Sequence, residues 1–256
     1  MHILVTNDDG VESPGILALA RALARAGHEI VVVAPTSDRS GSSAAIGPIH
    51  RSGPIPFRER SWPDLADVRV LAIDAPPATA VYAACLGGFG AVPNVVASGV
   101  NPGANTGHLV LHSGTVGAAL TAAGLGVPGL AVSLQWSEQG DYRWDTAAAF
   151  AAAAVDWVTE PTGGPRVLNV NVPNRPLAEV KGVREARLAP YGTVWTASAA
   201  TEHGDLLLEF KGNDVEPDPD TDLALVRAGY AAVSPLLGME RAPLAGAADA
   251  ITAALG

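Results

Sequence analysis

Short apolar runs rich in β-branched residues alternate, over roughly the first two thirds of the chain, with longer stretches in which apolar residues recur at helical spacing. The segment 14–26 is typical of the helical stretches, because Ile16, Leu19 and Leu23 fall on one face. The segment 29–34 is almost wholly apolar, as expected for a strand covered by helices on both faces. The same signals predict further strands at 2–6, 68–73, 94–97, 129–134 and 167–170, and further helices at 78–86, 115–124 and 145–158.

This alternation predicts an α/β fold, a Rossmann-like, doubly wound, mostly parallel sheet with a C-terminal β-hairpin and helix extension. We place the core domain at residues 1–175 and the extension at 176–256. In the extension, 193–199 and 206–211 are predicted to pair as a hairpin, 213–222 to form an acidic loop and 243–255 a closing helix. A hairpin of this kind is either an arm that packs on another subunit or one folded back on its own domain.

Composition and charge narrow the functional classes. With 256 residues, 48% of them hydrophobic and 16% charged, the chain is not disordered, and the single Cys85 excludes a disulfide scaffold. A formal net charge of −10 argues against binding to polymeric nucleic acid or to an anionic membrane. The start lacks a basic, signal-like segment, so we expect a cytoplasmic protein. A small anionic substrate fits if a bound cation reverses the local field.

Polar residues follow the predicted strands, and in a parallel sheet these positions meet at one edge. Asn7, Asp8 and Asp9 follow the first strand, Ser40 lies in the turn after the second, and Asn101 follows the strand at 94–97. Adjacent carboxylates are costly unless something positive lies between them, and such a set of oxygen atoms suits Mg²⁺, Mn²⁺ or Ca²⁺ better than zinc. The alternative is that both carboxylates merely cap a turn and the first helix.

A second cluster suggests an anion site. Ser113, Gly114 and Thr115 open a predicted helix, whose free N–H groups and dipole attract a phosphate. An ordinary Ser/Thr cap is the alternative interpretation. His112, just before it, is either a substrate contact or a plain polar residue. A hard-cation site beside an anion site suggests hydrolysis of a phosphate ester, with direct attack by water because no Ser–His or Cys–His pair is evident.

Several other features are interpreted as structural. Trp136, Trp144 and Trp157 lie in or near the Ala-rich helix at 145–158 and are interpreted as packing residues. The charged run 58–60 is interpreted as a solvated loop.

Motifs in one fixed order then suggest a family. They are Ile-Leu-Val-Thr-Asn-Asp-Asp-Gly at 3–10, 32–35 with Asp-Arg-Ser-Gly at 38–41, Ser-Gly-Val-Asn at 98–101 with Gly103 and Asn105, Ser-Gly-Thr-Val-Gly-Ala-Ala at 113–119, Leu-Asn-Val-Asn-Val-Pro at 168–173, and weaker matches at 221–222, 229–230 and 234–236. With this set the chain resembles the survival protein E family of metal-dependent 5′/3′-nucleotidases.

The resemblance implies a Rossmann-like core, a C-terminal extension exchanged between subunits of a dimer or tetramer, and hydrolysis of nucleoside 5′/3′-monophosphates to nucleoside and phosphate. It implies one Mg²⁺ or Mn²⁺ per subunit (Ca²⁺ in a crystal). The implied metal ligands are Asp8, Asp9, Ser40 and Asn101, with the two aspartates also catalytic. Near the phosphate it places Asn7, Asn105, Ser113, Gly114 and Thr115.

Four positions depart from the family pattern, namely Pro77, Pro102, His112 and Thr121. They lie where they could reshape the substrate pocket or the assembly, so the nucleotide preference stays open. Alternatives are a phosphatase for another small phosphomonoester, a non-catalytic nucleotide or metal sensor and, less well supported, a glycosyltransferase-like enzyme. The last would need a second Rossmann-like domain, for which the chain is short.

Overall fold

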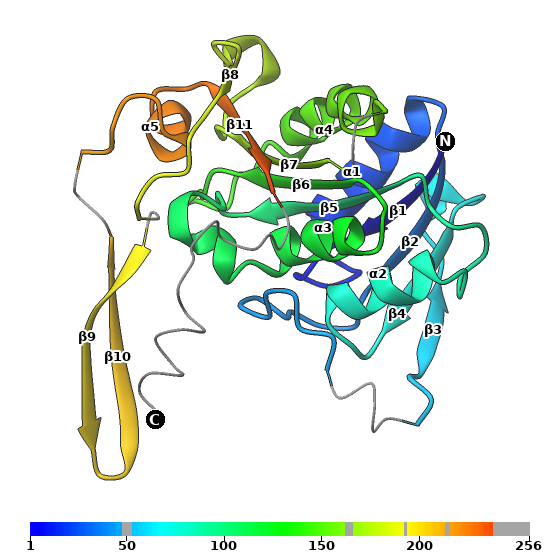
Figure 1. Cartoon of the computed structure of the whole chain (residues 1–256), viewed down its shortest axis with the longest axis horizontal. Coiled ribbons are helices and arrows are strands. Elements are labelled where there is room, and N and C mark those ends of the chain that lie inside the picture. Colours follow the sequence, from blue (N-terminus) through cyan, green and yellow to red (C-terminus); the bar gives the residue numbers. More distant parts are fainter. Residues whose placement is uncertain (48–52, 162–165, 192–193, 213–215, 238–256) are drawn as a thin grey trace, which may run out of the picture.

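A mixed sheet lies between two layers of helices and forms the body of the molecule (Figure 1). The computed structural model describes residues 1–47, 53–161, 166–191, 194–212 and 216–237. The strands are β1 His2–Thr6, β2 Glu29–Pro35, β3 Phe57–Arg60, β4 Arg69–Ile73, β5 Val95–Pro102, β6 Gly129–Leu134, β7 Val167–Val172, β8 Val183–Glu185, β9 Val194–Glu202, β10 Asp205–Gly212 and β11 Ala231–Leu236. The helices are α1 Pro14–Arg25, α2 Pro77–Cys85, α3 Gly114–Gly124, α4 Trp144–Thr159 and α5 Asp222–Arg227, with short 3-10 turns η1 Pro63–Leu65, η2 Gly107–Leu111 and η3 Leu177–Glu179.

The order of the strands confirms the predicted fold class. Nine strands follow the order β3-β4-β2-β1-β5-β6-β7-β11-β8. The six from β4 to β7 are parallel, whereas β3 and β11 run antiparallel to their neighbours. Numbered along the chain, the six parallel strands have the order 3-2-1-4-5-6, that of the dinucleotide-binding fold. The direction of winding therefore reverses between β1 and β5, and ligands bind at such a point.

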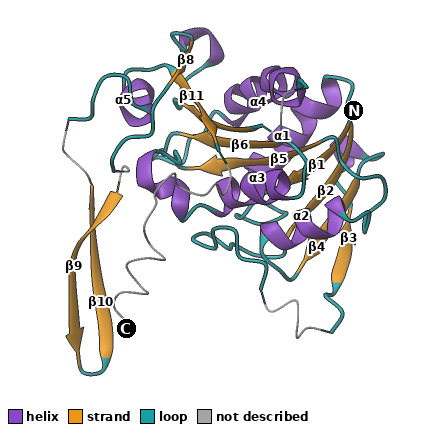
Figure 2. Cartoon of the chain, in the orientation of Figure 1, coloured by secondary structure: helices purple, strands orange, loops and turns teal. Residues whose placement is uncertain are grey.

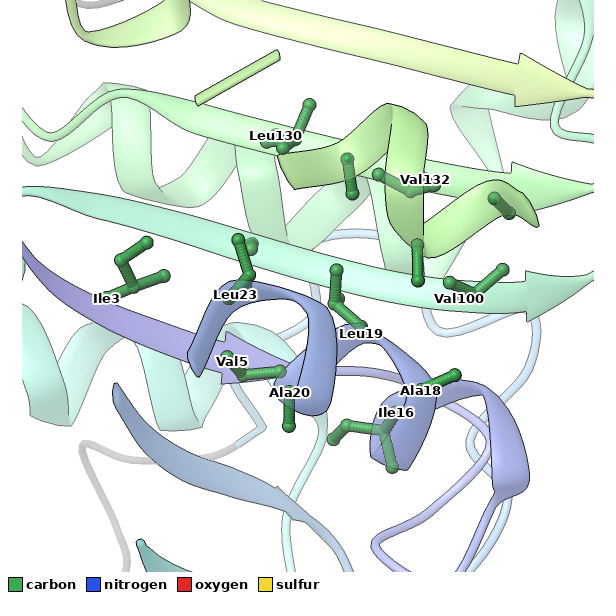
Figure 3. Close-up of a cluster of buried hydrophobic side chains, with 14 of the residues drawn as sticks. Ile3, Val5, Ile16, Ala18, Leu19, Ala20, Leu23, Val100, Leu130 and Val132 are labelled. Carbon is green, nitrogen blue, oxygen red and sulfur yellow. The ribbon is translucent and has the colours of Figure 1, made fainter. Parts of the chain in front are cut away.

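The two helical layers explain why the central strands carry apolar side chains on both of their faces. Helices α1 and α4 cover one face, and α2 and α3 cover the other (Figure 2). Successive side chains of a strand point to opposite faces, so Ile3 and Val5 pack with α1 while Leu4 packs with α2. Figure 3 shows Leu19 and Leu23 of α1 directed onto this first cluster. Burying each such side chain contributes about 1.5–3 kcal/mol.

One edge of the sheet differs from the prediction. The charged run 58–60 is exposed, but it lies in β3, which pairs antiparallel with β4. The interpretation as a loop was therefore wrong. All four residues of β3 are exposed, so charged side chains are compatible with this edge strand, and they also deter pairing with another chain.

The strand that carries Asn101 is also longer than predicted. We expected it to end at residue 97 and a loop to follow, but β5 continues to Pro102 after a shift of register between Ser98 and Asn101. This part of the prediction was wrong because Ser98 and Gly99 are turn-forming types. Here Ser98 is buried between β1 and β6, and beyond the register shift Asn101 and Pro102 pair with β6, so the strand ladder satisfies backbone groups that a turn would leave unpaired.

The part of the chain after residue 175 adds to the same sheet. Strand β11 pairs antiparallel with β7, and β8 pairs with β11, although neither strand nor α5 was predicted. The predicted hairpin is confirmed as β9–β10, with its turn between Glu202 and Asp205. Residues 216–221 form a loop, as predicted, but Asp222 is the first residue of α5 and not the end of the loop. The predicted closing helix at 243–255 lies outside the described residues. In the described part of the chain, no helix is both long enough and apolar enough to span a bilayer.

A buried carboxylate ties three distant segments together. Asp222 is fully buried, and its oxygens accept hydrogen bonds from the backbone N–H groups of Gly107 (2.8 Å), Ala189 (2.9 Å) and Leu223 (2.8 Å). Gly107 begins η2, the turn that leads into α3. Asp222 therefore fixes the approach to the start of α3.

We expect Asp222→Asn to lower the free energy of unfolding by about 1–3 kcal/mol, because an amide nitrogen replaces one acceptor and leaves a buried N–H unpaired. Urea denaturation measures the change. The exposed Asp220, which pairs with Arg187, supplies the control Asp220→Asn, whose effect should be clearly smaller. Equal effects of the two substitutions would contradict the role given to Asp222.

Candidate functional site

The candidate site lies where the sheet order reverses, at the carboxyl ends of β1 and β5. After β1 the chain turns at Gly10, whose φ of +104° is a conformation that glycine adopts without strain. The turn is held by the Val11 N–H, which donates to the carbonyl of Pro35 at 2.9 Å. The turn lets consecutive residues after β1 contribute to one site.

Asp8 is the more enclosed of the two predicted site carboxylates. Its side chain is buried, and its Oδ1 accepts a hydrogen bond from the Thr115 hydroxyl at 2.5 Å. The backbone carbonyl of Asp8 accepts a hydrogen bond from the Arg39 N–H at 2.6 Å, and this bond holds the loop after β2 against Asp8. A Cβ on Gly114 would lie 2.7 Å from Asp8 Oδ2, so only glycine lets the first residue of α3 approach this carboxylate so closely.

Thr115 also brings Asn101 to the carboxylate. Its Oγ1 lies 3.4 Å from Asn101 Oδ1 while it donates to Asp8. The amide nitrogen of Asn101 donates to the carbonyl of Gly103 at 2.7 Å, which leaves its oxygen turned toward Thr115. The structure thus brings together Asp8 and Asn101, from two neighbouring strand ends, as predicted.

The two carboxylates are costly to ionise. Burial raises the pKa of Asp8 above its ordinary value of 3.8, and the hydrogen bonds from Thr115 offset only part of that rise. Burial, and then the charges of Asp8 and Asp38, raise the pKa of Asp9 to about 7. The neighbouring guanidinium of Arg39 pairs instead with Asp74 at 2.6 Å.

The donor set fits a hard divalent cation. Among the described residues, no three His, Cys, Asp or Glu side chains gather as a metal site, so the carboxylate pair would be completed by neutral oxygens. Carboxylate, amide and hydroxyl oxygens are ligands that Mg²⁺ and Mn²⁺ accept. Asp8, Asp9 and Asn101 could hold such an ion. The side chain of Ser40 is exposed, although its N–H is fixed by Asp38 Oδ1 at 2.7 Å.

The start of α3 has two roles in this geometry. The Ser113 hydroxyl accepts from the Val116 N–H at 3.1 Å, as an ordinary helix cap does. The Thr115 side chain and N–H are both directed at Asp8. The helix terminus therefore faces the carboxylates, and a phosphate role for Ser113, Gly114 and Thr115 stays a prediction.

Asn7 and Asn105, the two asparagines predicted to lie near the phosphate, each donate a hydrogen bond to another residue of the chain. Asn7 donates to the carbonyl of Gly10 at 3.0 Å, and its Nδ2 lies 3.5 Å from Asp9 Oδ2. Asn105 donates to Ser133 Oγ at 2.9 Å. The phosphate contacts predicted for both residues stay predictions.

The residues that hold the loop after β5 in place were not predicted from the sequence. The carbonyl of Asn105 accepts from Asn169 Nδ2 at 2.9 Å and from Asn171 Nδ2 at 3.1 Å, so two asparagines of β7 fix the loop after β5. Alternating polar residues in a buried strand were the available signal for this β7 pair.

Ser42 was also missed. Its hydroxyl is buried without a hydrogen-bond partner and lies 2.8 Å from where a Cβ on Gly114 would be.

Comparison with known proteins gives a consistent picture. The family model described as "Survival protein SurE" matches residues 3–193. The chain is 35% identical over 243 residues to the 5′-nucleotidase SurE of Xanthomonas campestris pv. campestris, covering 92% of this chain and 89% of that one. It is 38% identical over 240 residues to the 5′/3′-nucleotidase SurE of Serratia proteamaculans, with 92% and 90% covered. A crystal structure of the SurE protein from Aquifex aeolicus superposes with a TM-score of 0.74 at 30% identity, covering 92% and 93%.

In metal-free protein, we expect the free energy of unfolding to fall as pH rises from about 4 to about 7. The folded state keeps the Asp9 proton up to about pH 7, whereas the unfolded chain loses it near 3.8, so this contribution is present at low pH and lost as pH rises. Urea denaturation in chelator at pH 5 and pH 8 measures the difference. Asp9→Asn should reduce that difference, and an unchanged pH dependence in the variant would contradict the expectation.

Proposed function

The chain belongs to the family described as survival protein SurE, and on this basis we propose that it is a divalent-metal-dependent phosphomonoesterase that hydrolyses nucleoside 5′- and 3′-monophosphates to nucleoside and phosphate. The observation that carries the proposal is the pair Asp8–Asp9 at the switch point. Asp8 is buried and faces the start of α3, Asp9 is half-buried beside it, and burial raises the pKa of each. Such a pair needs a positive partner, and Mg²⁺ or Mn²⁺ is the cation we propose.

Each part of the site has a task under this proposal. A bound divalent cation would supply Lewis-acid polarisation of a phosphoryl oxygen and an activated water. Asp8, Asp9 and Asn101 would hold it, with Ser40 as the fourth ligand. The N–H groups at the start of α3 would offset negative charge on the phosphate. Thr115 would keep Asp8 and Asn101 in register through its hydroxyl.

We expect Asp8→Asn and Asp9→Asn each to lower phosphate release from nucleoside monophosphates by on the order of 100-fold or more, since the loss of outer partners of a metal ligand alone costs about 10–100-fold. A colorimetric phosphate assay with Mg²⁺ or Mn²⁺ against a panel of 5′- and 3′-monophosphates, with and without chelator, measures this loss. Calorimetric titration with Mn²⁺ should show weaker binding in both variants.

Asp67 is exposed and lies two residues before β4, at the amino-terminal end of that strand, whereas the site lies at the carboxyl ends of the parallel strands. Asp67→Asn is therefore the matched control, and its turnover should be unchanged. Unchanged turnover in either site variant would overturn the assignment of the metal ligands. Binding of nucleotide without phosphate release across the whole panel would instead favour a sensor.

We also propose that the β9–β10 hairpin joins copies of this chain into a dimer or tetramer. It extends away from the sheet (Figure 1), and the consecutive leucines 206, 207 and 208 on β10 are 64%, 49% and 47% exposed. Exposed apolar residues grouped on one projecting element are typical of an interface.

Light scattering coupled to gel filtration tests this assembly. The double substitution Leu206→Glu and Leu208→Glu should reduce the measured mass to that of a smaller species, because burying the new carboxylates at an interface is unfavourable. Leu86, 75% exposed at the end of α2, supplies the control Leu86→Glu, which should leave the mass unchanged. A monomeric unsubstituted protein would contradict the proposal.

A further inference from the structure

An exposed aromatic ring stands beside the candidate site. Trp136 follows β6 by two residues, at the same edge of the sheet as Asp8, and its side chain is 65% exposed. The interpretation of Trp136 as a packing residue was therefore wrong. Trp144, by contrast, is partly buried against the main hydrophobic cluster, as predicted.

The ring of Trp136 is supported rather than free. Tyr142 meets it edge-on, with ring centroids 6.1 Å apart and planes at 75°, and Tyr142 in turn stacks on Trp144 at 4.6 Å and 26°. Edge-on and offset stacked pairs are the favourable arrangements of aromatic rings. These two ring contacts connect Trp136 to Trp144, which packs against the core, and most of the surface of Trp136 stays exposed to solvent.

The loop that carries Trp136 is also held by hydrogen bonds. The Ser137 hydroxyl donates to Asp141 Oδ1 at 2.5 Å, and Asn174 joins the loop through its amide to the Asp141 carbonyl at 3.1 Å. The Arg143 N–H donates to Asn174 Oδ1 at 2.8 Å. The ring is thus presented on an ordered loop, which lowers the entropy lost when a ligand binds to it.

The ring of Trp136 lies near Asn101, and this position indicates a function for the ring. A Cβ built on Gly103 would lie 3.7 Å from Asn101 Nδ2 and 4.0 Å from Trp136 Cε3, so the bare backbone of Gly103 separates the proposed metal ligand from the tryptophan. A nucleoside monophosphate carries its base one pentose away from its phosphorus. A phosphate bound between Asn101 and α3 therefore leaves the base within reach of this ring.

We propose that Trp136 is a base-binding residue, on whose exposed face the nucleobase of the substrate stacks. The inference rests on the proposed function and adds to it the residue that distinguishes a nucleotide from a phosphomonoester without a base. Stacking suits this task because every base has a π face, so the residue would favour nucleotides as a class rather than one base.

The test compares two substrates that share the pentose phosphate, AMP and ribose 5-phosphate. In Trp136→Ala, the ratio of KM for AMP to KM for ribose 5-phosphate should rise by about 5- to 150-fold, because an aromatic–base stack contributes about that factor in affinity. Trp136→Phe should restore most of the ratio. Trp157 is 40% exposed on α4 beneath Arg166, and Trp157→Ala is the control that should leave the ratio unchanged.

Binding without turnover gives an independent readout. AMP should quench the tryptophan fluorescence of the unsubstituted protein, and Trp136→Ala should abolish most of that quenching. If both substrates are hydrolysed and the KM ratio in Trp136→Ala is unchanged, the inference is wrong while the proposed function stands. If Trp136→Ala instead lowers the mass measured by light scattering without changing the ratio, the ring belongs to a subunit interface and the inference is again wrong. If no phosphomonoester is hydrolysed, the proposed function fails, and the quenching still decides whether Trp136 contacts a base.

Discussion

Two adjacent carboxylates, one buried and one half-buried, lie at the point where the winding of the sheet reverses, and the rest of the site is arranged around their charge. Asp8 receives the hydroxyl and N–H of Thr115, and Asp9 is approached by the amide of Asn7. These neutral donors offset only part of the cost of burial, since the pKa of each carboxyl stays above its ordinary value. A pair in this condition has a strong electrostatic preference for a hard cation, and a bound cation in turn attracts an anionic substrate.

The fold supplies this arrangement with rigid elements rather than with long loops. The ends of β1 and β5 and the first turn of α3 meet because the chain reverses its winding between the two strands. A belt of polar residues inside the sheet then fixes the outer loop, since Ser133, Asn169 and Asn171 all bind Asn105. Groups that must act together are thereby held by backbone geometry, which keeps the cost of organising them low when a ligand arrives.

The features that the sequence could predict are those with a local signal. Helix α1 has a periodic apolar face and a capping serine. The apolar runs of β1 and β2 indicate buried strands. The meeting of Asp8 with Asn101 was predictable because the carboxyl ends of parallel strands share one edge. The family resemblance added the expected ligand set.

The remaining features depend on contacts between distant segments. Strand β11 contains alanine, serine and proline, which are weak strand formers, and it exists because it pairs with β7. The extension of β5 past Ser98 depends in the same way on pairing with β6. The bridging role of Thr115 could not be read from the sequence, because it depends on how closely Gly114 lets α3 approach Asp8. The exposure of Trp136 likewise follows from the path of one loop.

The hydrogen bond between Gly107 and Asp222 spans 115 positions of the chain. During synthesis, the segment that opens α3 leaves the ribosome long before the carboxylate that will anchor it has been made. Strand β11 is translated later still, and it covers the edge of β7 on which Asn169 and Asn171 lie. The nascent polypeptide can therefore assemble most of its parallel sheet early, but its site gains its final supports only after residue 236 has emerged.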